Sequence, residues 1–247
     1  MQTPRVVVWF SCGAASAVAA QQALKIYGAD HEVVVVYCDT SKNEHSDNAR
    51  FMADVERWLG VKIITIKSPK YSRVEQVFRA RQYMSGIHGA PCTVELKKIP
   101  RFIFQQADDL NIFGFTADKK EFKRRKDFTT NNPEMALAWV LQDAGITKRK
   151  CFQILLGAGI ELPMMYQLGY QNNNCIGCVK ATSPAYWAKI KKDFPREFAA
   201  RAKQSRKIGC KLTRINDVRI YLDELPEGNY GRYKAEDISC GPECGTK

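Results

Sequence analysis

Short apolar runs alternate with segments of helical character along the first part of the chain. Residues 6–10, 33–38 and 61–66 are apolar and rich in β-branched side chains, as buried strands are. Between them, residues 14–24 are rich in alanine, and residues 46–59 repeat apolar side chains at helical spacing. This strand–helix alternation with short links predicts a Rossmann-like, doubly wound parallel α/β sheet.

The pattern continues with a fourth apolar run at residues 111–116, which predicts a fourth strand. The basic stretch at residues 117–132 is expected to be a loop. Asn132 followed by Pro133 has the composition of a helix start, and we expect that helix to end near Gly145. A further helix is expected over residues 148–156.

The last third of the chain reads as helices followed by a hairpin and a tail. Ser183 and Pro184 are typical of a helix start, and a second helix is expected from Pro195 to Lys207. Asn216-Asp217 separates two short runs and predicts a two-residue hairpin turn. With 247 residues, we expect an α/β domain over residues 1–170 and a cysteine-bearing C-terminal region over residues 171–247.

A turn of small residues joins the first strand to the first helix. Main-chain N–H groups at such a helix start can point at an anion, and bulky side chains would block its approach. The turn contains neither the Gly-Lys-Ser/Thr of a Walker loop nor GxGxxG. It predicts a phosphate cradle, with an ordinary strand-to-helix turn as the alternative. The candidate residues are Ser11, Cys12, Gly13, Ala14, Ala15 and Ser16.

A polar pair, Asp39-Thr40, follows the second strand. Open parallel sheets bind their ligands outside the carboxyl ends of the strands. We therefore expect Asp39 and Thr40 to lie near the same ligand as the turn.

The formal net charge of +12 bears on which class of molecule the protein binds. Such an excess favours an anionic partner, either a nucleic acid or a highly charged nucleotide, although a solvated basic surface is the alternative. No run reaches the roughly 18 apolar residues that a membrane span needs, and the first residues lack the apolar segment of a signal peptide. We expect a cytoplasmic protein with no membrane partner.

Nine cysteines are many for a cytoplasmic chain, where disulfides are rare, so metal binding or thiol chemistry is expected. Cys175-Ile176-Gly177-Cys178 places two thiols where they can chelate one metal or cluster. The alternatives are a redox dithiol and two incidental cysteines. The others that stand among turn residues are Cys92, Cys240 and Cys244. Two cysteines in a polar, glycine-rich tail suggest that the tail folds back onto a site, with a disordered end as the alternative.

Several of these stretches together resemble the phosphoadenosine phosphosulfate (PAPS) reductase-like branch of the adenine nucleotide α-hydrolase, or PP-loop, superfamily. Ser11, Gly13 and Ser16 match the family's Ser-Gly-Gly-x-Asp-Ser loop, whereas Cys12 and Ala15 depart from it. Ala15 replaces an aspartate that ATP-cleaving members carry and that sulfonucleotide reductases often lack. The resemblance spans about residues 5–244 and implies that residues 1–170 form a nucleotide-binding PP-loop domain.

Other segments extend the resemblance. Asp39-Thr40 with Glu44 is similar to the family's Asp-Thr-Gly…Glu segment, with Ser41 in place of the glycine. Cys92 with Lys97 and Pro100 is similar to its Cys…Arg-Lys-x-x-Pro segment, in which basic residues meet the nucleotide's anionic groups; Leu96 stands where the arginine is usual. The remaining matches are Pro163, Tyr166, Gly169 and Tyr170 before Cys175 and Cys178, and Glu243-Cys244-Gly245 near the end.

The resemblance implies first a sulfonucleotide reductase. PAPS or adenosine phosphosulfate (APS) would bind with its phosphates at Ser11–Ser16. Cys244 would be the nucleophile that attacks the sulfonyl sulfur, and a thioredoxin-like reductant would then release sulfite. Such chemistry needs an ionised thiol beside cationic groups.

A second function fits the same resemblance: an ATP-dependent sulfurtransferase that thiolates a nucleic-acid base, with Mg²⁺ accompanying ATP. Cys92, Cys175 and Cys178 would hold a [4Fe–4S] cluster with one iron open, or Cys240 or Cys244 would complete it as a fourth ligand. A third possibility is a nucleotide-binding subunit without turnover, in a modification or defence system. The missing aspartate at Ala15 is consistent with that role, whereas the organised cysteines argue against it.

Overall fold

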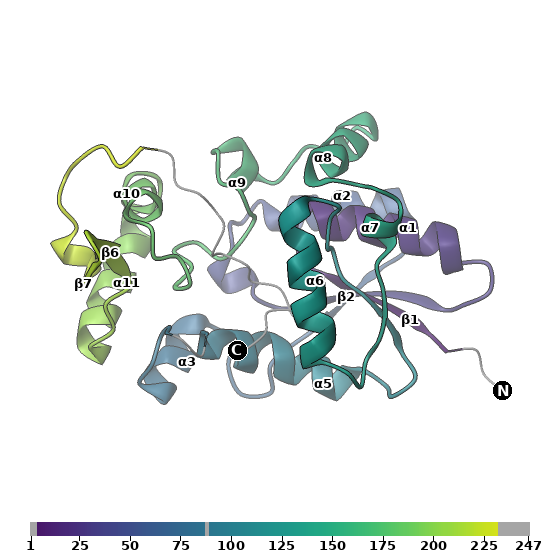
Figure 1. Cartoon of the computed structure of the whole chain (residues 1–247), viewed down its shortest axis with the longest axis horizontal. Helices are drawn as coiled ribbons and strands as arrows, with labels where there is room; N and C mark the ends of the chain where they lie inside the picture. Colours follow the sequence, from purple (N-terminus) through teal and green to yellow (C-terminus); the bar gives the residue numbers. More distant parts are fainter. Residues whose placement is uncertain (1–3, 87–88, 232–247) are drawn as a thin grey trace.

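A computed structural model of the chain, which describes residues 4–86 and 89–231, shows a parallel five-stranded sheet with helices on both faces (Figure 1). The strand order is β3-β2-β1-β4-β5, which is compatible with a Rossmann-like fold and confirms the expected doubly wound parallel sheet. The strands are β1 (Val6–Phe10), β2 (Val33–Cys38), β3 (Ile63–Ile66), β4 (Leu110–Ile112) and β5 (Ala136–Ala138).

β1 lies at the centre of the sheet and all five of its residues are buried. It pairs in parallel with β2, where Val6 lies opposite Val33, and with β4, where Val6 lies opposite Leu110. From β1 the chain first adds strands on one side, up to β3, and then returns to the other side with β4. The strand order therefore reverses between β1 and β4, and the crevice at this point is where open α/β sheets bind ligands.

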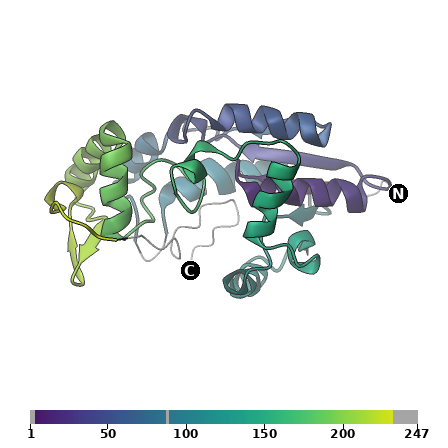
Figure 2. The ribbon, with the colours of Figure 1, turned by 90° about the horizontal axis from the view of Figure 1, so that it is seen from above.

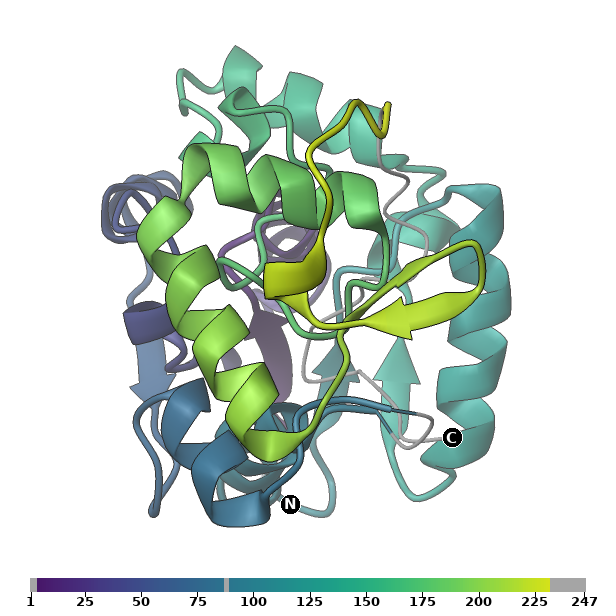
Figure 3. The same ribbon diagram turned by 90° about the vertical axis from the view of Figure 1, so that its left-hand side faces the viewer.

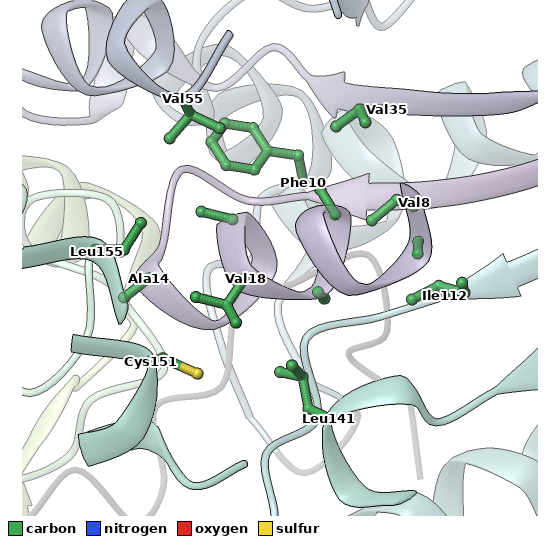
Figure 4. Packing of buried hydrophobic residues seen from close by; sticks show 14 of the residues in the cluster. Val8, Phe10, Ala14, Val18, Val35, Val55, Ile112, Leu141, Cys151 and Leu155 are labelled. Atoms are coloured by element: carbon green, nitrogen blue, oxygen red, sulfur yellow. The ribbon is translucent and has the colours of Figure 1, made fainter. Parts of the chain in front are cut away.

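Two hydrophobic clusters cover the two faces of the sheet. One cluster packs around α1, whose Ala14 and Val18 point toward Leu155, Cys151 and Leu141 of the neighbouring helices α8 and α7 (Figure 4). The other is rich in aromatic side chains and includes Phe128 of α6. On the α1 side lie α1 (Ala14–Tyr27), α2 (Asn48–Leu59), α7 (Val140–Asp143) and α8 (Lys148–Gly157); on the opposite side lie α5 (Ile99–Phe104) and α6 (Lys119–Asn131).

A third hydrophobic cluster lies beyond the carboxyl ends of the strands, at one end of the molecule (Figure 2). Figure 3 shows its helices in front of the sheet. Its elements are α3 (Val74–Arg81), α4 (Pro91–Thr93), a π-helical turn (Val94–Lys98), α10 (Pro184–Asp193), α11 (Pro195–Ile208), the hairpin β6 (Thr213–Ile215) and β7 (Val218–Ile220), and the 3-10 turn η3 (Leu222–Glu224). The C-terminal helices thus share one cluster with residues 74–96, and the expected boundary at residue 170 stays a prediction.

Most expected elements are confirmed, including the hairpin, whose turn residues Asn216 and Asp217 have φ of 46° and 63°. The prediction that the basic stretch at residues 117–132 is a loop is wrong, because Lys119–Asn131 form the helix α6. The helix expected after Asn132 is also wrong: β5 stands there, followed by the short α7. β4 ends at Ile112 instead of Thr116.

The remaining short elements are the 3-10 turn η1 (Ser41–Asn43) and α9 (Met164–Gln167). Within residues 4–86 and 89–231, no helix has the length and apolar character needed to cross a membrane.

Candidate functional site

The loop Ser11–Ser16 leaves the central strand at the point where the strand order reverses. Cys12 adopts a left-handed conformation with φ of 53°, which turns the chain sharply from β1 into α1. The Ser16 hydroxyl closes the turn: it accepts from the Ser11 N–H at 3.1 Å and donates to the Gly13 carbonyl at 2.9 Å. The predicted cradle is therefore a closed loop of small residues.

The first main-chain N–H groups of a helix have no acceptor inside the helix. In α1 the Ala14 N–H is bound by the Tyr166 hydroxyl oxygen. The N–H groups of Gly13, Ala15 and Ser16 find no acceptor in the described part of the chain. They give the loop donors for an anion, at the positive end of the helix dipole.

Gly114 brings the chain after β4 into close contact with this loop. A Cβ at Gly114 would lie 2.8 Å from the Ser16 nitrogen and 3.0 Å from the Ala15 carbonyl carbon. Only glycine permits this approach, because those neighbours are main-chain atoms that cannot turn aside. Gly114 therefore sets the distance between the ends of β4 and the start of α1.

Residues distant in the sequence clamp the loop from the other side. Asn173 is 7% exposed, and its Nδ2 donates to the Cys12 carbonyl at 2.6 Å and to Asn48 Oδ1 at 2.7 Å. The Tyr166 hydroxyl accepts from the Ala14 and Asn173 main-chain N–H groups, and burial raises the pKa of Tyr166 to about 12. A Cβ at Gly13 would lie 3.3 Å from the Tyr166 oxygen, so the clamp leaves little room for a larger residue.

The orientation of Asn173 leaves one polar atom for a ligand. Asn48 Nδ2 donates to the Glu44 carboxylate at 2.8 Å, so Asn48 presents its oxygen to Asn173. Asn173 then presents its NH₂ group to two acceptors, and its Oδ1 is buried without a donor among the described residues. A buried acceptor of this kind costs free energy unless a water or a ligand N–H or O–H satisfies it.

Thr40 and Glu44 form a hydrogen-bonded network at the end of β2. The Tyr37 hydroxyl donates to Glu44 Oε2 at 2.8 Å and accepts from the Thr40 N–H at 3.2 Å, and the Thr40 hydroxyl donates to Glu44 Oε1. Asp39 instead accepts from the Ser41 hydroxyl at 2.6 Å. Thr40 is thus joined through Glu44 and Asn48 to the loop, whereas the bonds of Asp39 stabilise the turn that follows β2.

Lys97 lies near Cys38, at the carboxyl end of β2, and its contact with the nucleotide's anionic groups stays a prediction. Its carbonyl accepts from the Cys38 thiol at 3.6 Å, and its ammonium lowers the pKa of Cys12. Burial and the Glu44 carboxylate act more strongly in the opposite direction, so the pKa of Cys12 stands well above its ordinary value. The Cys12 thiol is therefore neutral, although it lies in the candidate phosphate loop.

Lys148 is a residue near the site that the sequence analysis did not single out. Its ammonium binds Asn172 Oδ1 at 2.7 Å and the Gln171 carbonyl, and it lies 5.5 Å from the centre of the Tyr166 ring. Burial lowers the pKa of Lys148 to about 8, and the charge of Lys120 acts in the same direction. Lys148 thus places next to Tyr166 an ammonium group that gives up its proton more readily than an ordinary lysine.

The Cys-x-x-Cys turn is buried beside α10. Gly177 has φ of 63°, and a Cβ there would lie 3.4 Å from the Trp187 ring, so both conformation and space favour glycine. The Cys178 N–H donates to the Tyr186 hydroxyl at 2.9 Å. Cys178 belongs to the third hydrophobic cluster, against which Cys92 also packs.

Thiolates are the ligands that an iron–sulfur cluster requires, so the residue types at Cys92, Cys175 and Cys178 fit one. Among residues 4–86 and 89–231, however, no three His, Cys, Asp or Glu side chains form a metal-binding group. The predicted ligand Cys240 and the predicted nucleophile Cys244 lie outside the described residues. The [4Fe–4S] cluster stays a prediction.

The residues that sequence reasoning missed are Gly114, Asn48, Asn173 and Lys148. Gly114 gave one signal, since it interrupts an aromatic run, Phe113-Gly114-Phe115. Asn173 stands in a run of three asparagines that look alike in the sequence.

Comparison with known proteins adds no family to this geometry. The chain matches no protein-family model, and no curated protein matches it.

Proposed function

We propose that this chain is an adenine-nucleotide-binding enzyme of the PAPS reductase-like branch of the PP-loop superfamily. The nucleotide's phosphates bind the main-chain N–H groups of Ser11–Ser16. The observation that carries the proposal is the position of this loop: it lies at the reversal of strand order, it has N–H groups with no acceptor among residues 4–86 and 89–231, and Asn173 clamps it. The resemblance of the loop and of the Thr40–Glu44 segment to the family supports the same assignment.

The reaction that we propose is reduction of a sulfonucleotide. A thiolate attacks the sulfonyl sulfur of PAPS or APS, a bond from sulfur to sulfur forms, and the bond from sulfur to the phosphate oxygen breaks. The nucleotide leaves with its 5′-phosphate, and the enzyme holds an S-sulfocysteine. A dithiol reductant of the thioredoxin class then attacks the cysteine sulfur, sulfite leaves, and the reductant becomes a disulfide after its second thiol reacts. This chemistry belongs to a reducing cytoplasm.

We assign the nucleophile to Cys244. Cys12 is adjacent to the proposed phosphate site, but its raised pKa leaves too little thiolate for attack. Cys151 is also held protonated, because burial raises its pKa to about 12. These two thiols are therefore unsuited to the attack, and Cys244 is the cysteine that the resemblance places in this role.

Intact-protein mass spectrometry after anaerobic incubation with PAPS or APS, without reductant, tests the reaction. We expect a sulfonate adduct in the wild-type protein and in Cys210→Ser, and no adduct in Cys244→Ser. Cys210 is the matched control because it is a half-buried thiol that contacts the Ser85 carbonyl. An adduct that persists in Cys244→Ser would refute the assignment, and no adduct from either compound would refute the reductase reaction.

The buried Cys-x-x-Cys turn favours a second candidate, the ATP-dependent thiolation of a nucleic-acid base. That reaction would produce AMP and pyrophosphate from ATP, with Mg²⁺, only when nucleic acid is present. The same incubations with ATP, with and without nucleic acid, and with AMP and pyrophosphate measured in the solution, separate the two candidates. Binding of nucleotide without any turnover would instead indicate a non-catalytic subunit.

A bound cluster is tested separately. We expect anaerobically purified protein to contain iron and acid-labile sulfide and to absorb visible light. We expect Cys175→Ser to lose the iron, the sulfide and the absorption. Unchanged iron content and colour in Cys175→Ser would exclude Cys175 as a ligand.

A further inference from the structure

The outward face of α6 carries a row of lysines with an aromatic ring among them. At 100° per residue, Lys119, Phe122, Lys123 and Lys126 lie within one third of the helix circumference, opposite Phe128. Phe128 is buried in the aromatic cluster at 5% exposure, so the row points to solvent. The three lysines are exposed, and Phe122 is 47% exposed. Below, we call these four residues the α6 lysine row.

The other charges of α6 are engaged elsewhere. Arg124 binds Glu121 at 3.0 Å and lies 4.7 Å from the centre of the Phe115 ring. Arg125 lies 4.9 Å from the centre of the Trp139 ring and 3.6 Å from Asp143.

The lysines of the row have no carboxylate within ion-pair distance among the described residues. Asp127 is exposed at the edge of the row and offsets one charge. The outer face of α6 therefore keeps a net positive charge after Asp127 is counted.

The row leads towards the candidate nucleotide site. Asp118, directly before α6, accepts from the Lys148 N–H at 2.8 Å and joins the start of α6 to the start of α8. The charge of Lys120 acts on Lys148, and Lys148 lies over the Tyr166 ring that binds the phosphate loop. The lysines of α6 and Lys148 thus form a series of positive charges that extends from Lys126 to Tyr166.

We propose that the α6 lysine row binds a single-stranded nucleic acid, with phosphates on the lysines and an unpaired base stacked on Phe122. Lys119 to Lys126 spans about 10 Å of helix, the length of roughly three stacked nucleotides. An acidic protein would be attracted by the lysines alone, whereas the exposed ring between them favours a ligand that carries phosphates and flat bases together. The surface binds strands whichever reaction takes place at the nucleotide loop.

Fluorescence anisotropy with labelled 20-nucleotide DNA and RNA strands, over a range of salt concentrations, tests this proposal. Each phosphate contact contributes about 0.7 to the slope of log affinity against log salt for a single strand. Lys119→Gln/Lys123→Gln/Lys126→Gln is therefore expected to weaken binding and to lower the slope by about 2. Phe122→Ala is expected to weaken strand binding about fivefold or more and to affect a 20-base-pair duplex less.

A matched variant separates a specific surface from the total charge. Lys192→Gln/Lys203→Gln/Lys207→Gln removes the same three charges from exposed positions on α10 and α11. We expect this variant to retain the wild-type salt slope. An equal loss in both triple variants, no salt-dependent binding by the wild-type protein, or equal competition by polyglutamate would overturn the proposal. Circular dichroism of each variant confirms that it is folded.

Discussion

The two faces of the sheet are packed with different kinds of side chain. On one face, α1 contributes small buried residues, which include Ala14, Ala17 and Ala20. On the other, large rings meet edge to face: the ring centres of Phe113 and Phe128 are 4.9 Å apart, and those of Phe115 and Trp139 are 5.1 Å apart. Around α1 the first face thus relies on a close approach of main chain, although Phe10 and Phe51 also stack there, whereas the second face is packed mainly by large rings.

This difference explains how each face is used. Small residues let α1 approach β1 and bring its N–H groups to the strand ends, where the candidate phosphate loop lies. Phe128 is the buried residue of α6, so its remaining positions are available for charged side chains. We infer that the small-residue face determines the nucleotide site and that the aromatic face supports a charged outer surface.

Phe128→Ala tests the aromatic face and has the largest expected effect on stability. It leaves a cavity among Phe113, Phe115 and Trp139, and we expect the free energy of unfolding to fall by about 3–5 kcal/mol in urea titration. Phe122→Ala on the same helix is the matched control, with an expected change within about 0.5 kcal/mol because Phe122 is half exposed. Equal losses in the two variants would show that α6 is not held by Phe128.

Gly114→Ala tests the close packing of the other face. The added methyl would collide with Ser16 and Ala15 main-chain atoms, and we expect a loss of about 1–3 kcal/mol of stability together with weaker nucleotide binding, measured by calorimetry. Gly157→Ala at the end of α8 adds the same methyl with no atom within 4 Å of it and is expected to leave nucleotide affinity unchanged. Unchanged nucleotide affinity in Gly114→Ala would show that the loop Ser11–Ser16 does not bind the nucleotide.

Asn173→Ala tests the clamp that holds the loop against α2. It removes the donors to the Cys12 carbonyl and to Asn48, and we expect a loss of roughly 1–2 kcal/mol, or about tenfold, in nucleotide affinity. If the melting temperature falls while affinity stays constant, Asn173 has only a structural role.

Lys148 begins α8 and is hydrogen-bonded to Asp118, directly before α6. Its contributions to stability and to anion binding both depend on pH. With a folded pKa of about 8 and an ordinary value of 10.5, the unfolded chain binds more protons between these values, so this group's contribution to stability rises with pH across that window. Binding of anions changes in the opposite direction, because Lys148 loses its charge above about pH 8. We expect PAPS affinity to fall a few-fold from pH 7 to 9 in the wild-type protein.

Lys148→Arg keeps the positive charge at both pH values. We expect its PAPS affinity to change less between pH 7 and 9 than that of the wild-type protein. Parallel profiles for the two proteins would assign the pH dependence to another group.

The fold was predictable where local composition and tertiary role agree. The apolar runs of β1, β2 and β3, the alanines of α1 and the helical spacing of residues 46–59 were all interpreted correctly. The sequence failed at α6 and β5. With Phe128 as the buried side chain, α6 shows little apolar periodicity, and β5 is short and follows a proline that suggested a helix.

The sequence by itself determined the strand–helix alternation and the small residues of the phosphate loop, because both depend on neighbours along the chain. Only the tertiary structure decided which distant groups complete the site. Asn173 reaches Cys12 across 161 residues and Asn48 across 125, and no local pattern records either contact. The low pKa of Lys148 likewise arises from burial beside α6 and the clamp, since desolvation depends on packing and not on sequence position.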